Sequence, residues 1–145
     1  MRAIRIGVDL GGTKIEVIAL DDAGRTLARH RVPTPRNDYA GTLNAIADLV
    51  RGLESELGAR GSVGVGTPGS LSPFSGRMRN ANSVWLNGRA LDRDLSEALQ
   101  RPVRLANDAD CFALHRYEDR MARSLASVVN ILDPDVVVLG DGLSN

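Results

Sequence analysis

Val8-Asp9-Leu10-Gly11-Gly12-Thr13-Lys14 sets where the first expected strand must turn, because an apolar, β-branched run ends there on an acid and two glycines. The glycine pair fits a tight hairpin with its glycines at positive φ. It equally fits a turn whose backbone N–H groups converge on phosphate oxygens. In the second case Thr13 adds a hydroxyl donor, Lys14 adds a point charge, and Asp9 holds Mg²⁺ through water. Both interpretations stay open at this point.

The chain around this turn predicts alternating strands and helices. Strands are expected over residues 4–9, 14–20, 26–32, 62–66, 103–106 and 135–139, and helices over 38–57, 91–99 and 109–132. Segment 67–89 is rich in Gly, Pro, Ser and Asn and contains the only tryptophan, so it predicts a long structureless loop with a functional role. Such alternation is typical of an α/β protein.

Composition limits what the protein can do. Its 145 residues suffice for one domain, or two thin halves, and its 18 basic and 18 acidic residues give no net attraction to nucleic acid or to an anionic membrane. Cys111 is the only cysteine, so neither an intrachain disulfide nor a zinc site is expected. His30 and His115 are predicted at the surface without an evident acidic partner. No signal peptide or membrane-spanning run is present, which predicts a cytoplasmic protein.

Two further loops follow predicted strands. Asn107-Asp108 opens a predicted helix, where the carboxylate could act as a base toward a hydroxyl or could simply cap the helix. Thr67-Pro68-Gly69 is a turn, or a rigid wall where backbone approaches a ligand closely. Ligands of open α/β sheets bind at the carboxyl ends of strands, so these loops and the turn after Asp9 are expected to converge on one crevice.

Five segments, in order, resemble motifs of the ROK family of sugar kinases, with the closest likeness to bacterial fructokinases and manno(fructo)kinases. They are VDLGGTK (8–14), GVGTPG (64–69), NANSVWLNG (80–88), LANDAD (105–110) and VNILDPDVVVLG (129–140). The last of these resembles the C-terminal half of the family.

The resemblance implies ATP- and Mg²⁺-dependent phosphorylation of a hexose, fructose or mannose, on the actin-like, ribonuclease H-like α/β fold. It implies Asp108 as the general base, and Asp9 as the residue that positions Mg²⁺. The ATP phosphates would be lined by Gly11, Gly12, Thr13 and Lys14, and the sugar would be held by Pro68, Gly69, Asn82 and Asn107.

The sequence also departs from the family pattern. Residues 1–114 resemble the N-terminal domain and 115–145 a helix and strand of the C-terminal domain, without the intervening segment that carries a second phosphate loop, a sugar-binding Glu/His motif and a zinc cluster. The alternative is therefore a shortened, inactive relative, acting as a sugar- or nucleotide-binding module or surviving as a structural remnant. An apolar strand left uncovered by the shortening would favour a homo-oligomer, expected to be a dimer.

Overall fold

The computed structural model describes residues 3–107 of the chain. The expected helix at 109–132, the strand at 135–139, Cys111, His115 and Asp108 therefore lie outside the described residues. The elements are β1 (Ile4–Leu10), β2 (Lys14–Leu20), β3 (Thr26–Pro33), α1 (Tyr39–Leu57), β4 (Gly61–Thr67), β5 (Ser70–Leu71), β6 (Met78–Arg79), a 3₁₀ helix (Val84–Leu86), α2 (Leu91–Leu99) and β7 (Val103–Asn107).

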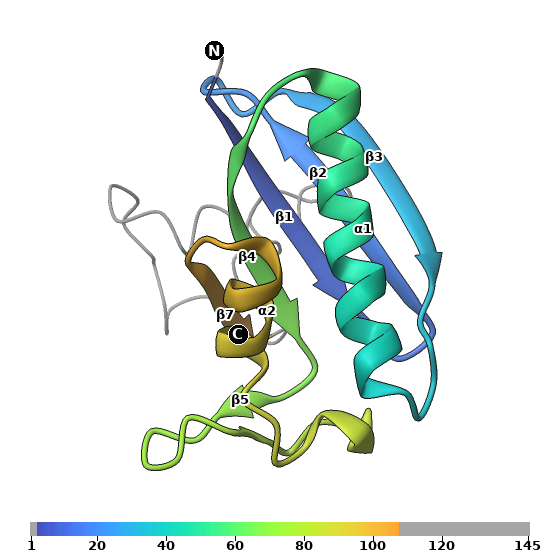
Figure 1. Ribbon diagram of the computed structural model, residues 1–145, viewed down its shortest axis with the longest axis vertical. Coiled ribbons are helices and arrows are strands. Elements are labelled where there is room, and N and C mark those ends of the chain that lie inside the picture. The colour runs from blue at the N-terminus through green and yellow to red at the C-terminus, as the bar shows by residue number, and fades with distance from the viewer. Residues whose placement is uncertain (1–2, 108–145) are drawn as a thin grey trace, which may run out of the picture.

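Five of the strands form one mixed sheet in the order β3-β2-β1-β4-β7. The β1–β2 and β2–β3 pairs are antiparallel hairpins, whereas β4 pairs in parallel with both β1 and β7. Helices α1 and α2 contact each other and lie on the same face of this sheet (Figure 1). The strands and helices expected from the sequence within the described residues are confirmed, as is the α/β class.

The core follows from the two-residue period of a strand. Ile6, Val8 and Leu10 of β1 belong to one buried cluster together with apolar residues of α1 and α2. The residues between them point to the opposite face, where Ile18 and Leu20 of β2 form a separate buried pair. Asp9 and its cross-strand partner Glu16 lie on this second face, away from the helices.

Local chemistry sets the ends of α1. The Asp38 carboxylate accepts a hydrogen bond of 2.8 Å from the Gly41 N–H, which satisfies one of the free donors of the first turn. Gly58 ends the helix in the left-handed conformation, with φ of 59°, which a residue lacking a Cβ adopts without strain. Within residues 3–107 the structure contains no helix both long and apolar enough to cross a membrane.

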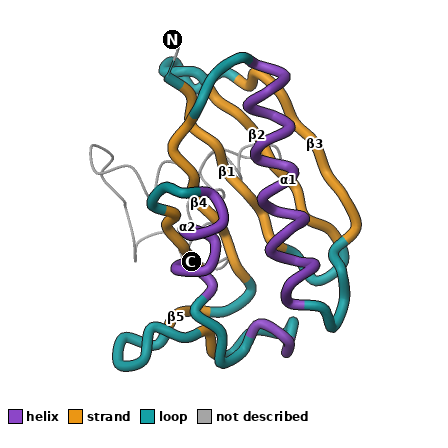
Figure 2. The backbone as a smooth tube through the Cα atoms, in the orientation of Figure 1, coloured by secondary structure: helices purple, strands orange, loops and turns teal. Residues whose placement is uncertain are grey.

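The prediction of a structureless loop over 67–89 was wrong. The segment forms the β5–β6 hairpin and then the 3₁₀ helix, at the end of the sheet where β4 finishes (Figure 2). Backbone hydrogen bonds from Met78 N–H to the Arg89 carbonyl (2.7 Å) and from Gly88 N–H to the Met78 carbonyl (2.8 Å) close it. Strands of two residues have no detectable period, which is why the sequence pattern did not indicate them.

Candidate functional site

The candidate site lies at the carboxyl end of three adjacent strands. Asp9 of β1 is in register with Gly66 of β4, and Gly66 is in register with Ala106 of β7. Neighbouring strands lie about 4.8 Å apart, so the backbones of Asp9 and Ala106 are separated by about 10 Å. The loops that follow these strands therefore leave the sheet side by side, at the edge where β1 and β4 point in Figure 1.

The turn after β1 connects a β-hairpin, and the residues at its tip are exposed. The Gly11 N–H donates to the Lys14 carbonyl at 3.0 Å, and Gly12, Thr13 and Lys14 are exposed. The expectation of positive φ at these glycines was wrong, because neither is among the glycines of the described chain with positive φ. Gly11 is required for another reason, since a Cβ there would lie 2.9 Å from the Lys14 carbonyl oxygen. The hairpin and the phosphate-binding interpretations are thus compatible.

Asp9 is a half-buried carboxylate with little local compensation. Burial, and then the nearby charge of Glu16, raise the pKa of Asp9, while Lys14 opposes them. Glu16 is paired with the Arg29 guanidinium, whereas Asp9 accepts no hydrogen bond from any residue in 3–107. Such a carboxylate suits a hard cation. Residues 3–107 contain no group of three His, Cys, Asp or Glu side chains able to hold a metal by themselves.

The loop after β4 is joined to the end of β7 through the Gly69 carbonyl. Gly69 O accepts hydrogen bonds from Thr67 Oγ1 and from Asn107 Nδ2, both at 2.9 Å. Gly69 is buried against β6, and Pro68 beside it is half-buried. The structure therefore brings Asn107 and Gly69 together. Asp108 follows Asn107 directly in sequence but lies outside the described residues.

The loop that carries Asn82 abuts the glycine turn. Asn82 is exposed, and a Cβ built on Gly12 would lie 3.5 Å from Ser83 Oγ. Ser83 is only 3% exposed, and its hydroxyl makes no hydrogen bond within the described part of the chain. The contact places the predicted sugar loop against the predicted phosphate turn.

Trp85 and Asn87, to which the sequence analysis assigned no role of their own, hold this loop in place. The Asn87 side chain accepts from Ala81 N–H (3.0 Å) and donates to the Ala81 carbonyl (3.2 Å), which closes the loop on itself. Trp85 Nε1 donates to Thr42 Oγ1 of α1 at 3.3 Å. Their partners are distant or backbone groups, so no sequence spacing indicates these contacts.

A further pair of side chains ties α1 to α2 near the same loop. The Tyr39 hydroxyl donates to the Asp94 carboxylate at 2.6 Å, and the Arg89 guanidinium lies 4.8 Å from the centre of the Tyr39 ring. Burial, followed by the hydrogen bond to Asp94, raises the pKa of Tyr39. The phenol therefore stays protonated and holds the two helices together over the ordinary pH range.

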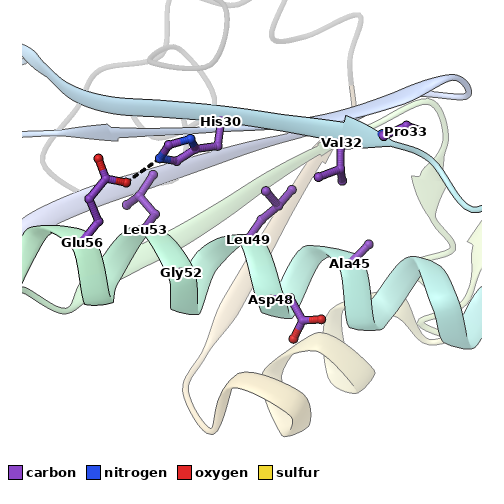
Figure 3. Close-up of a pocket in the computed structure, with 9 residues that line it drawn as sticks. All are labelled: His30, Val32, Pro33, Ala45, Asp48, Leu49, Gly52, Leu53 and Glu56. Atoms are coloured by element: carbon purple, nitrogen blue, oxygen red, sulfur yellow. Dashed lines mark hydrogen bonds and ion pairs between the residues drawn. The ribbon is translucent and has the colours of Figure 1, made fainter.

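A separate cleft of about 540 Å³ lies between β3 and α1 and reaches Pro33, the last residue of β3 (Figure 3). It is lined mainly by apolar side chains such as Val32, Leu49 and Leu53, and Asp48 points away from it. His30 at its rim is exposed as predicted, but the expectation that it lacks an acidic partner was wrong. Its Nε2 contacts Glu56 Oε2, a residue 26 positions further along the chain, which explains why the sequence did not reveal the pair.

Comparison with known proteins places this geometry in a family. The model of the ROK family matches residues 5–120, and the chain belongs to the ROK family. It is 41% identical over 137 residues to the N-acetyl-D-glucosamine kinase of Pectobacterium atrosepticum, covering 94% of this chain and 43% of that relative.

Solved structures agree with this assignment. The ROK hexokinase from Thermus thermophilus is 38% identical with a TM-score of 0.66, covering 79% of this chain and 38% of that one. The ROK family glucokinase from Streptomyces griseus, solved with glucose and AMPPNP, is 30% identical with a TM-score of 0.68, covering 79% and 36%. The fold is that of the actin-like ATPases, and the described residues represent part of its N-terminal domain.

The chain spans about two fifths of the length of the curated relative. The expected likeness to fructokinases is not supported, because that relative is an N-acetyl-D-glucosamine kinase.

Proposed function

We propose that the chain carries the nucleotide- and sugar-binding face of a hexose kinase, which transfers the terminal phosphoryl group of ATP to a sugar hydroxyl. The observation that carries this proposal is the register of Asp9, Gly66 and Ala106 on three neighbouring strands. That register sets the exposed glycine turn and Asn107 at the same end of the sheet, because the Asp9 and Ala106 backbones that precede them lie about 10 Å apart. Phosphoryl transfer depends chiefly on such positioning and on charge stabilisation.

Each residue has a chemical task in this proposal. The exposed backbone at Gly12 and the Thr13 hydroxyl donate to phosphate oxygens, and Lys14 adds a positive charge. Mg²⁺, when bound, neutralises charge on the phosphates, and Asp9 holds it through water because hard cations prefer oxygen ligands. Asn107 and Asn82 bond the sugar, Pro68 and Gly69 shape its wall, and Asp108 accepts the proton of the attacking hydroxyl.

The substrate is proposed to be an amino sugar related to N-acetylglucosamine. The name of the curated relative supports this choice over fructose or mannose, which the sequence resemblance favoured. No described residue separates these sugars on geometry alone, so the choice rests on similarity. Fructose and mannose therefore belong in the same assay as competitors.

A coupled assay of ADP release tests the activity. The chain is supplied with ATP, Mg²⁺ and, in turn, N-acetylglucosamine, glucose, mannose and fructose. The expected result is turnover that is largest with N-acetylglucosamine and is abolished by Asp108→Asn. Turnover that is equal in the chain and in Asp108→Asn would remove the kinase proposal.

The same geometry supports a second candidate, a module that binds nucleotide or hexose without turnover. The tasks proposed for Gly12, Lys14 and Asn107 are to bind or position a ligand, and a binding module needs those same tasks. Calorimetry with an ATP analogue and with each hexose separates the two candidates. Binding without ADP release, weakened by Gly12→Val because the larger side chain would meet Ser83, would establish the module.

Three wider expectations are proposals as well. Residues 1–114 and 115–145 would correspond to parts of two family domains, the chain would form a dimer, and it would act in the cytoplasm. Sedimentation at several protein concentrations tests the dimer directly.

A further inference from the structure

Thr34 contacts both ends of the glycine turn. Its hydroxyl Oγ1 donates to the Gly11 carbonyl at 2.8 Å, and its backbone N–H donates to the Thr13 carbonyl at 3.0 Å. The residue is only 6% exposed, so it lies behind the turn and cannot itself meet a ligand of appreciable size. One residue thus fixes the two carbonyls that flank Gly12.

The sequence around Thr34 makes it a rigid support. Pro33 ends β3 opposite Lys14, and Pro35 follows immediately. Each proline ring fixes its own φ, and a residue that precedes proline is restricted to extended conformations. The backbone of Thr34 is therefore already restricted before the two hydrogen bonds form. Forming them costs little conformational entropy.

Holding the Gly11 carbonyl also orients the next amide. In a planar trans peptide the C=O and the following N–H point in opposite directions, and the described chain contains no cis peptide. Because the Gly11 oxygen points at Thr34, the Gly12 N–H points away from it. Gly12 is exposed, and its N–H donates to no acceptor in residues 3–107, so the donor is available to a ligand.

We infer that Thr34 is a positioning residue for the nucleotide: it holds the glycine turn so that the Gly12 N–H stays directed at a phosphate oxygen of ATP. The inference rests on the proposed function. It extends the site to a buried side chain that never touches substrate. Without the hydroxyl, the Gly11–Gly12 peptide can rotate, and the donor is aimed correctly for only part of the time.

The test compares three variants of the full chain. Thr34→Val keeps the shape and burial but removes the hydroxyl donor, whereas Thr34→Ser keeps the donor and removes a methyl group. Thr26→Val makes the same chemical change at the exposed first residue of β3 and serves as the matched control. For each variant the Kd of an ATP analogue with Mg²⁺ and the Kd of the preferred hexose are measured by calorimetry, with KM and kcat added where turnover is seen.

Thr34→Val is expected to weaken nucleotide binding about 3- to 10-fold, as the loss of one neutral hydrogen bond implies, with the hexose Kd unchanged. Thr34→Ser should restore nucleotide binding to within about twofold of the unchanged chain. A Thr34→Val variant that binds the analogue as tightly as the unchanged chain overturns this inference alone. Equal losses for nucleotide and hexose, or no rescue by Thr34→Ser, show a merely structural role and also overturn it.

Failure of the proposed function gives a different result. An unchanged chain that binds no nucleotide refutes the nucleotide site itself, and this inference with it. A ligand-free NMR measurement then shows whether the Thr34 hydroxyl holds the Gly11–Gly12 peptide. The amide resonance of Gly12 should shift in Thr34→Val and keep its position in Thr26→Val. An unmoved Gly12 resonance in Thr34→Val would contradict the geometry on which the inference is built.

Discussion

The substitution Gly69→Ala should push the loop proposed to hold the sugar away from β6. Gly69 is buried where the loop after β4 passes under β6, and its carbonyl accepts from Thr67 and Asn107. An added Cβ would lie 2.6 Å from the Arg79 carbonyl oxygen and 2.9 Å from the Ala81 N, both of which are backbone atoms. A flexible side chain could turn aside, but these backbone groups can only move together with β6.

The size of the effect follows from these distances. An ordinary Cβ contact begins at 3.4 Å, so Gly69 and β6 must separate by about 0.8 Å. Overpacking of this kind costs about 1–3 kcal/mol of unfolding free energy. A displacement close to 1 Å at a site that positions substrate can lower activity by about 100-fold. Hexose binding should therefore weaken much more than nucleotide binding, because the glycine turn belongs to another strand.

Urea unfolding and calorimetric hexose binding measure both effects, with Gly52→Ala as the matched control. Gly52 lies on the exposed side of α1 with no atom within 4 Å of the position of its Cβ. Alanine there should stabilise the chain by about 0.5–1 kcal/mol, since glycine is a poor helix former. If Gly69→Ala were as stable as Gly52→Ala and bound hexose normally, the close approach of Gly69 to β6 would be refuted.

Three further predictions concern charge and burial. Burial and Glu16 raise the pKa of Asp9, so the folded chain binds a proton on this carboxylate more tightly than the unfolded chain does. The ionised carboxylate therefore destabilises the fold, and the stability gained by Asp9→Asn should grow as the pH rises above the ordinary carboxyl pKa of 3.8. Urea titrations at several pH values check this. Glu54→Ala should lower the unfolding free energy by about 1–3 kcal/mol, measured by urea, because the Arg101 guanidinium would lose its carboxylate and the Gly61 N–H its acceptor; an unchanged unfolding free energy would contradict the pairing. Ser83→Ala should leave the melting temperature unchanged or raise it, because the buried hydroxyl has no partner within residues 3–107, and a clear drop would show that one exists.

The elements with a strong local signal could be predicted from the sequence. The strands on either side of the glycine turn alternate apolar and charged residues, and the Asp38 and Gly58 caps mark the ends of α1. The convergence of loops at one sheet edge also followed, because it is a general property of parallel strands. The observed register of β1, β4 and β7 then showed how far apart the strands lie where these loops begin.

The remaining features depend on contacts between distant residues. Thr34 is linked to Gly11 across 23 positions, and His30 to Glu56 across 26, with nothing in either local pattern to indicate the partner. The β5–β6 hairpin is too short to show a period. The conformation of Gly11 was predicted wrongly because a short contact with a carbonyl oxygen, rather than an unusual φ, excludes a side chain there.

β3, one of the two edge strands of the described sheet, affects how the protein behaves in a crowded solution. β3 has only β2 beside it, and its exposed residues include Arg29, His30 and Arg31, with Pro33 as its last residue. A strand edge is a template for other chains, but the exposed Arg31 would repel its counterpart in a second copy, and proline offers no N–H to continue the ladder. The β3 edge of the described sheet should therefore resist pairing with a second copy, even at concentrations where an uncharged edge would aggregate.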